Sequence, residues 1–181
     1  MPRRGSEGVT LIELMVGLAI LAIVLALGTP NFSVFIQNGK IRNAADAMVN
    51  GLNLAKTEAV RRNTQVQFSL SGTDSSWQVG CATSSANCPD SIQSRPASEG
   101  STGISVTATD SNLAFDGYAR VATTLAAGAN ATFDIRNPAG GTGTAAGGAM
   151  RCLRVFVSSG GQIRMCDPAL TLSKPSDPQP C

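Results

Sequence analysis

Apolar residues form one nearly unbroken run close to the amino terminus of this 181-residue chain. The run extends from Val9 to Thr29, and as a helix rising about 1.5 Å per residue it would be roughly 31 Å long, the thickness of a bilayer's hydrocarbon core. Arg3 and Arg4 precede it, and positive charge of this kind stays on the cytoplasmic side of a membrane. The pattern therefore predicts a transmembrane helix over residues 9–29, with the following domain outside the cytoplasm.

Helical periodicity continues beyond the apolar run. Over residues 30–63, apolar residues recur at spacings of three and four and predict an amphipathic helix with one stripe: Ile41, Ala45, Met48, Leu52, Ala55 and Ala59. Pro30 lacks a backbone N–H and should kink the helix where the membrane ends. Gly39 and Gly51 should each weaken it by about 1 kcal/mol relative to alanine. We expect a sheet to pack on the stripe; the alternative is contact between helices of neighbouring chains.

After Asn63 the period of the pattern changes to two, which is typical of β-strands. Seven segments fit strands separated by turns: 65–70, 77–81, 104–109, 113–121, 131–136, 152–158 and 161–166. The predicted fold class is therefore α+β. A long N-terminal helix packs on a small antiparallel β-domain over residues 64–168, and a proline-rich tail follows over residues 169–181.

The composition excludes several kinds of chemistry. Because the chain has no histidine, it lacks Ser-His-Asp and Cys-His catalysis and any metal site that needs imidazole. Asp110, Asp116 and Asp134 are scattered without the spacing of a paired-carboxylate site. A net charge of +2 provides no overall basic field for nucleic acid. We expect no enzyme activity, cofactor, metal or small-molecule substrate.

Five cysteines remain to be assigned, and no two of them form the C-x2-4-C pair of a zinc site. Disulfides suit an oxidising compartment outside the cytoplasm. The predicted pairs are Cys81–Cys88 and Cys152–Cys166, the second stapling the ends of the predicted hairpin "CLRVFVSSGGQIRMC". Closing a loop of about fifteen residues is worth roughly 3 kcal/mol in the chain-entropy model. Cys181 is then expected to have no partner within the chain.

Glu13 lies inside the apolar run, which contains no lysine or arginine to neutralise it. Inserting such an acid into a membrane costs at least about 2.5–3.5 kcal/mol, which marks it as a functional residue. A cleaved secretory signal would have a shorter apolar region, and a plain anchor helix would not need the acid. Glu13 therefore indicates a cationic partner from outside the run.

The segment "EGVTLIE" around this acid resembles the processing site of type IV prepilins and type II secretion pseudopilins. The resemblance implies a basic leader over residues 1–8, cleavage between Gly8 and Val9 by a prepilin peptidase, and methylation. Glu13 becomes the fifth mature residue, which in this family pairs with the new α-amine of another subunit during assembly. Pro30 matches the family's proline after the membrane stretch, whereas Val9 stands where phenylalanine is usual.

The C-terminal part of the chain resembles FimT/FimU- and GspH-type minor pilins, through "LAFDGYAR", the hairpin segment and the ending Cys166-Asp167-Pro168. The resemblance implies a minor type IV pilin, anchored in the inner membrane by a single helix, with its globular domain in the periplasm. It would join the pilus fibre together with major and minor pilins and contact the assembly platform. A minor pseudopilin of type II secretion is one alternative.

DNA capture during natural transformation is a second alternative that the resemblance allows. Gln162 replaces the first arginine of the family's G-R-x-R pattern, and the remaining candidates for phosphate contacts are Arg136, Arg151, Arg154 and Arg164. Arg154 and Arg164 can act together only if strand register places them on one face. Trp77 and Tyr118 could stack on bases, although a lone tryptophan is more often a core residue.

The processing motif predicts that the mature chain begins at Val9. Intact-mass analysis of the protein isolated from its native membrane or filament should therefore give a mass lacking residues 1–8. A mass that retains Met1, or a terminus beyond Thr29, would contradict the assignment.

Overall fold

The computed structural model describes residues 8–123, 125, 129–140, 150–170 and 181, without the side chains of residues 27–31. The chain divides into two units, Met1–Ile36 and Gln37–Cys181, and helix α1 (Leu11–Arg62) contributes to both. Pro30 lies within the helical bounds of α1, but its side chain is outside the described part, as are Arg3, Arg4 and most of the tail. The predicted kink at Pro30 therefore stays a prediction.

The first unit is the N-terminal part of α1. Thr10 caps the helix: its hydroxyl oxygen accepts a hydrogen bond from the Glu13 N–H at 3.3 Å, and its carbonyl accepts one from Leu14 N–H at 3.2 Å. The large apolar side chains between Val9 and Leu25 are all more than half exposed. Among the residues described, no helix combines the length and the hydropathy needed to cross a membrane.

The C-terminal end of α1 is defined by a left-handed residue. Asn63 has a φ of 48°, Asn63 N–H donates to the Val60 carbonyl, and Thr64 N–H donates to the Ala59 carbonyl. This pair of bonds is a Schellman motif, which satisfies the last helical carbonyls and turns the chain toward the first strand. The predicted helix end at residue 63 is thus within one residue of the observed end.

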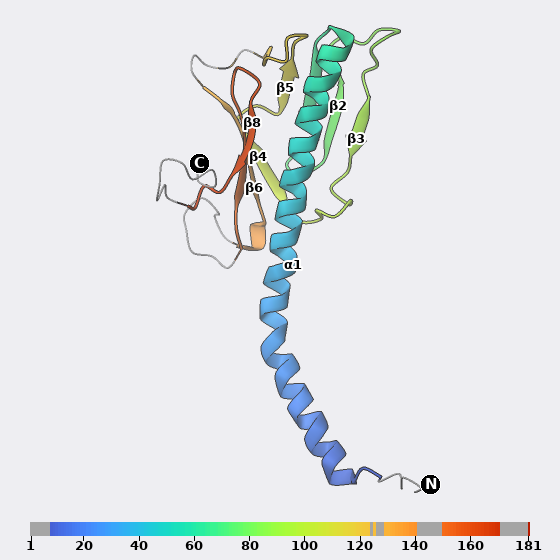
Figure 1. Ribbon diagram of the computed structural model, residues 1–181, viewed down its shortest axis with the longest axis vertical. Helices are drawn as coiled ribbons and strands as arrows, with labels where there is room; N and C mark the ends of the chain where they lie inside the picture. The colour runs from blue at the N-terminus through green and yellow to red at the C-terminus, as the bar shows by residue number, and fades with distance from the viewer. Residues whose placement is uncertain (1–7, 124, 126–128, 141–149, 171–180) are drawn as a thin grey trace, which may run out of the picture. The chain divides into compact units, whose positions relative to one another are not determined.

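The second unit contains two antiparallel sheets of four strands each (Figure 1). The first has the order β3-β2-β1-β5, with β3 Gln93–Arg95, β2 Trp77–Cys81, β1 Val66–Leu70 and β5 Asn112–Phe115. The second has the order β4-β6-β7-β8, with β4 Ser105–Ala108, β6 Ala131–Arg136, β7 Leu153–Val157 and β8 Ile163–Cys166. A short 3-10 turn, Pro138–Gly140, follows β6.

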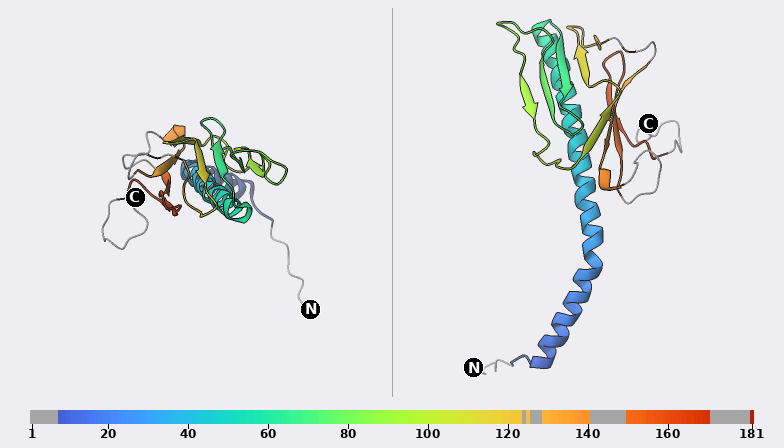
Figure 2. Two further views of the ribbon diagram at one scale, coloured as in Figure 1. Left: turned by 90° about the horizontal axis from the view of Figure 1, so that it is seen from above. Right: turned by 180° about the vertical axis from the view of Figure 1, so that it is seen from behind.

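The C-terminal half of α1 lies along both sheets, as the view from behind shows (Figure 2). The six residues of the predicted stripe are all buried in the one hydrophobic core, so the prediction of a sheet-packing face is confirmed. Phe68 is at the centre of this core, with ring centroids 5.7 Å from Trp77 and 5.8 Å from Phe133. The α+β fold class expected from the sequence is the observed one.

Two strand predictions need correction. The segment 113–121 is a strand only as far as Phe115, because the Asp116 carboxylate accepts hydrogen bonds from the N–H groups of Tyr118 and Arg120 at 2.9 Å and stabilises a turn. Ala119 in that turn has a φ of 64°. Strand β3 was not predicted, since a three-residue edge strand of polar residues has no apolar alternation.

Gly39 and Gly51 have the same helix propensity, but their surroundings in the structure differ. A Cβ on Gly51 would stand 2.8 Å from Cε2 of Phe68 and 3.1 Å from the Trp77 ring, whereas a Cβ on Gly39 would meet no heavy atom within 4 Å. Gly51→Ala should therefore lower the free energy of unfolding by about 1–3 kcal/mol through overpacking. Gly39→Ala should raise it by up to about 1 kcal/mol. Chemical denaturation of both variants provides the test, and equal shifts of the same sign would contradict the described packing.

Candidate functional site

The predicted processing site lies immediately before α1. Gly8 and Val9 are exposed, with Val9 74% accessible, and the first helical residue is Leu11. Glu13 is in the first turn, where its charge also favours the helix dipole. Over the part of the chain that is described, its carboxylate forms no ion pair. The roles of Gly8, Val9, Glu13 and Pro30 in cleavage and assembly stay predictions.

Thr10 is a residue of this region that the sequence reasoning missed. Together with Glu13 it forms the pattern Thr-x-x-Glu, which is a recognised signature of a helix N-terminus. The signature could have been read from the sequence, and it places Glu13 in the first helical turn, where an acid also favours the helix dipole. Any test of Glu13 must therefore separate the acid from the helix cap.

Three of the four candidate DNA-binding arginines share one face of the second sheet. The register pairs Asp134 with Arg154 across β6 and β7, and Phe156 with Arg164 across β7 and β8. Because side chains alternate along a strand, Arg136, Arg154 and Arg164 all face away from the buried side. Arg151 precedes β7, and its backbone N–H donates to the side-chain oxygen of Asn38.

The surroundings of these arginines limit the charge that they can present. Arg154 donates from Nε and Nη2 to the Asp134 carboxylate at 2.6 and 3.0 Å, and this pairing raises the pKa of Arg154. The Nε of Arg136 is buried without a hydrogen-bond partner in the described structure. Arg164 lies over the Phe156 ring, 5.9 Å from its centroid, and is exposed. A phosphate would therefore have to compete with Asp134 for Arg154.

The two candidate aromatic residues differ in accessibility. Trp77 is 3% exposed and belongs to the core, so it cannot stack on a base, in keeping with its expected structural role. Tyr118 is 80% exposed, and the Arg120 guanidinium lies 5.3 Å from its ring centroid. The aromatic and the basic candidates thus do not form one interleaved surface of the kind that binds single strands.

One predicted disulfide is present and the other is not. Cys81 is joined to Cys88, but Cys166 is joined to Cys181, and the predicted pair Cys152–Cys166 is wrong. The turn over residues 158–162 pairs Val157 with Ile163, so Arg154 lies opposite Cys166. Cys152 is two positions farther along, and a diagonal spacing of about 7–8 Å between Cα atoms exceeds what a disulfide spans. The thiol of Cys152 is buried, which raises its pKa, and the Asp167 carboxylate raises it further.

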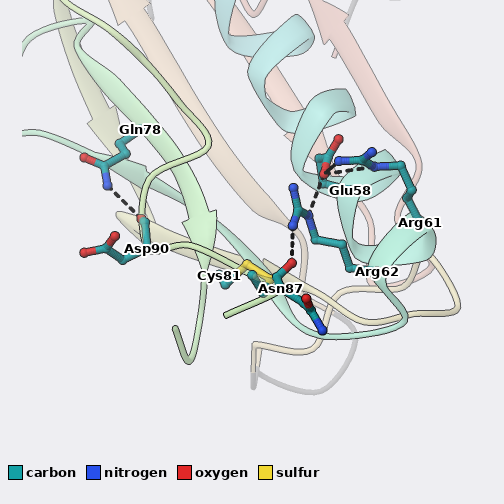
Figure 3. The surroundings of a disulfide bond; sticks show 8 residues. Glu58, Arg61, Arg62, Gln78, Cys81, Asn87 and Asp90 are labelled. Carbon is teal, nitrogen blue, oxygen red and sulfur yellow. Dashed lines mark hydrogen bonds and ion pairs between the residues drawn. A yellow bond between two sulfur atoms is a disulfide. The ribbon is translucent and has the colours of Figure 1, made fainter. Parts of the chain in front are cut away.

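The Cys81–Cys88 loop is bound to the end of α1 (Figure 3). Glu58 is 9% exposed, and its Oε2 accepts hydrogen bonds from Arg61 Nη2 at 2.7 Å and Arg62 Nε at 2.7 Å. Arg62 also donates from Nη1 to the Asn87 carbonyl in the disulfide loop. The hydrogen bond from Arg61, and then that from Arg62, lowers the pKa of Glu58 against the opposing effect of burial. The Glu58–Arg62 ion pair is thus part of a tertiary contact.

A long N-terminal helix packed on antiparallel sheets, behind a "GVTLIE" motif, defines a protein of the pilin class. The family described as "Type II transport protein GspH" matches residues 44–161, and the "Prokaryotic N-terminal methylation motif" matches residues 3–29. Because the first match covers more than half of the chain, the chain belongs to the GspH family of minor pilins and pseudopilins. No curated protein sequence matches the chain.

The solved structures of one minor pilin have the same fold. The type IV minor pilin FimU of Pseudomonas aeruginosa is 15–16% identical to this chain in its two crystal forms. One form covers 68% of this chain and 90% of FimU with a TM-score of 0.50; the other covers 77% and 95% with a TM-score of 0.52. The solution structure of E. coli GspH is 15% identical, covers 79% and 95%, and has a TM-score of 0.44.

The lowered pKa of Glu58 predicts a pH-dependent contribution to stability. A carboxylate whose pKa is lower in the folded than in the unfolded chain stabilises the fold above its unfolded pKa, and this is lost as pH falls through the folded pKa. Glu58→Gln should cost about 1–3 kcal/mol near neutral pH and less at about pH 3, because below the unfolded pKa the wild type progressively loses the same interaction. Denaturation at both pH values measures the difference. Asp46→Asn, which removes only an exposed pair with Arg42 at 3.8 Å, is the control and should show little effect at either pH.

Proposed function

We propose that this protein is a minor type IV pilin, a structural subunit that takes part in the assembly and priming of a pilus after a prepilin peptidase removes residues 1–8. The observation that carries the proposal is an acid, Glu13, in the first turn of an exposed apolar helix, without an ionic partner in the part of the chain described. The likeness in fold to FimU, a type IV minor pilin, supports the same assignment.

Cleavage supplies the missing charge. Hydrolysis of the bond between Gly8 and Val9 creates an α-amine that is largely protonated near neutral pH. An acid in a membrane costs about 2.5–3.5 kcal/mol on insertion scales, so an amine from another subunit that reaches Glu13 removes a large part of that cost. The pairing thereby favours insertion of each processed helix next to a previously inserted one.

The exposed apolar side chains of the first unit provide the second contribution. Ile12, Leu18 and Leu25, for example, are 57–71% exposed in the isolated chain. In the membrane, residues 9–29 would contact lipid, and in the fibre they would pack against the helices of neighbouring pilins. The membrane anchor, the inner-membrane location and the assembly platform as a partner all belong to this proposal.

The second unit suits a periplasmic location. Its core is formed by residues from Ile41 onward, so its packing does not depend on the apolar run. It also contains both disulfides of the described chain, and disulfides persist in an oxidising compartment such as the periplasm.

A minor pseudopilin would have the same fold and the same processing motif. The phenotype of a deletion strain must therefore distinguish a pseudopilin from a minor pilin. A deletion that abolishes piliation and leaves type II secretion intact supports the pilin, and the reverse result supports the pseudopilin. DNA capture is less well supported, because the Asp134 carboxylate occupies Arg154 and Gln162 stands in place of a basic residue.

Glu13→Ala should leave the second unit folded and the chain cleaved, but reduce its incorporation into pili by at least about tenfold, since a lost ion pair in a membrane is worth several kcal/mol. Quantitative immunoblots of sheared pili against total membranes measure this ratio. Thr10→Ala is the matched control because it removes the helix cap and keeps the acid, so it should incorporate nearly normally. Equal defects in both variants would mean that Glu13 acts through the helix cap, and normal incorporation of Glu13→Ala would contradict the proposal.

A further inference from the structure

The peptide bond between Gly8 and Val9, at which cleavage is proposed, lies outside α1. Gly8, Val9 and Thr10 are not helical, and the first helical residue is Leu11. All three non-helical residues are exposed, and a Cβ placed on Gly8 would meet no heavy atom within 4 Å. Over the described residues, the Gly8 carbonyl accepts no hydrogen bond. The carbonyl that hydrolysis must attack is therefore free and open to approach.

The side chain of Thr10 determines where α1 begins. Its hydroxyl oxygen accepts a hydrogen bond from the Glu13 N–H at 3.3 Å, and its carbonyl accepts one from the Leu14 N–H at 3.2 Å. A residue in this capping position has a non-helical backbone, so the helix starts only after Thr10. Two non-helical residues thus separate the scissile bond from the helix. The cap uses the backbone N–H of Glu13 and does not need its carboxylate.

Without this cap, α1 would lengthen toward the scissile bond. No residue from Leu11 to Val16 is of a type that caps helices, whereas Gly8 and Ser6, upstream of Thr10, both are. In an apolar run the backbone groups favour helical hydrogen bonds, because unsatisfied groups are costly in lipid. The new helix start would therefore be Gly8 or Ser6, and would not lie farther inside the run.

Either new start would change the reacting carbonyl. Helical bonds join the carbonyl of residue i to the N–H of residue i+4, so the Gly8 carbonyl would accept the Ile12 N–H. Hydrolysis adds water to the Gly8 carbonyl carbon and breaks its bond to the Val9 nitrogen, which leaves a Gly8 carboxylate and a Val9 ammonium. An enzyme must place its own donor on that carbonyl oxygen as negative charge develops there. A non-helical Gly8 leaves the oxygen available for this donor.

We propose that Thr10 is a positioning residue for prepilin cleavage: its hydroxyl caps α1 and thereby keeps the Gly8–Val9 bond non-helical for the peptidase. The inference rests on the proposed cleavage at this bond and adds a residue that controls its rate. Thr10 and Glu13 then have separate roles, the hydroxyl in cleavage and the carboxylate in assembly. Because loss of the cap slows cleavage without preventing it, Thr10→Ala is still processed to completion during growth and reaches the pilus nearly normally.

Timed cleavage of the full-length chain by its prepilin peptidase in mixed micelles separates capping from direct recognition of the side chain. Thr10→Val keeps the shape of threonine but cannot cap the helix. It should raise KM by about three- to tenfold with kcat unchanged, because only the non-helical fraction of the substrate binds. Thr10→Asn changes the shape but keeps a capping side chain, so its KM should be that of wild type. Glu13→Ala keeps the backbone N–H and should also be cleaved as wild type is.

A second measurement reports the conformation of the scissile bond without the peptidase. Gly8–Val9 is the only Gly-Val pair in the chain, so labelling glycine carbonyls with 13C and valine nitrogens with 15N gives a single carbonyl–amide correlation. In micelles, Thr10→Val should move the Gly8 carbonyl resonance downfield toward helical values. Thr10→Asn should leave it where it is in wild type.

The outcomes distinguish this inference from the proposed function. The positioning role is overturned, with cleavage itself intact, if Thr10→Val has the KM of wild type or leaves the Gly8 resonance unmoved. It is also overturned if Thr10→Val is cleaved faster than Thr10→Asn, because a subsite that reads the shape of the side chain would then explain the result. A wild-type chain that is not cut between Gly8 and Val9 would overturn the proposed function and this inference together.

Discussion

The close approach of α1 to the two sheets is the constraint on which the rest of the structure depends. Ala45, Ala55 and Ala59 on the contacting face are fully buried, and Gly51 leaves no room for a Cβ beneath Phe68 and Trp77. Small residues on the helix leave room for the aromatic rings of Phe68 and Trp77 to pack closely against it. The helix is thereby held over β1 and β2. This position determines the contacts at the C-terminal end of the helix and at the β3 edge of the first sheet.

Two consequences follow from that position. At the helix end, Glu58 is buried between Arg61 and Arg62, and Arg62 in turn contacts the Cys81–Cys88 loop through Asn87. At the β3 edge of the first sheet, a groove lined by residues such as Asn50, Trp77 and Gln93 lies between the strands and α1. From the sequence, the Glu58–Arg62 pair resembles an ordinary surface ion pair within one helix. In the structure, Arg62 also connects the helix to Asn87, 25 residues away in the chain.

Strand register decided the chemistry of the second sheet. The register of β6 and β7 sets Arg154 against Asp134, which neutralises one candidate phosphate ligand. The hairpin turn over residues 158–162 sets Arg154 against Cys166 and so moves Cys152 out of reach of Cys166. A turn shorter by two residues would have placed the two cysteines opposite each other. Cysteine spacing and basic composition were both visible in the sequence. The partner of each cysteine and of each arginine, however, depends on the strand register, and a different register would pair them differently.

The sequence by itself determined the apolar run with its acid, the buried stripe of α1, the end of the helix and most of the strands, because these depend on local periodicity and on residue types within one turn or one strand. Only the tertiary structure decided the short polar strand β3, the turn at Asp116, the Cys166–Cys181 pairing, the neutralised Arg154 and the groove beside Trp77. Each of these depends on which residues meet across strands or between helix and sheet, and hydrophobic patterning does not encode such pairings at single-residue precision.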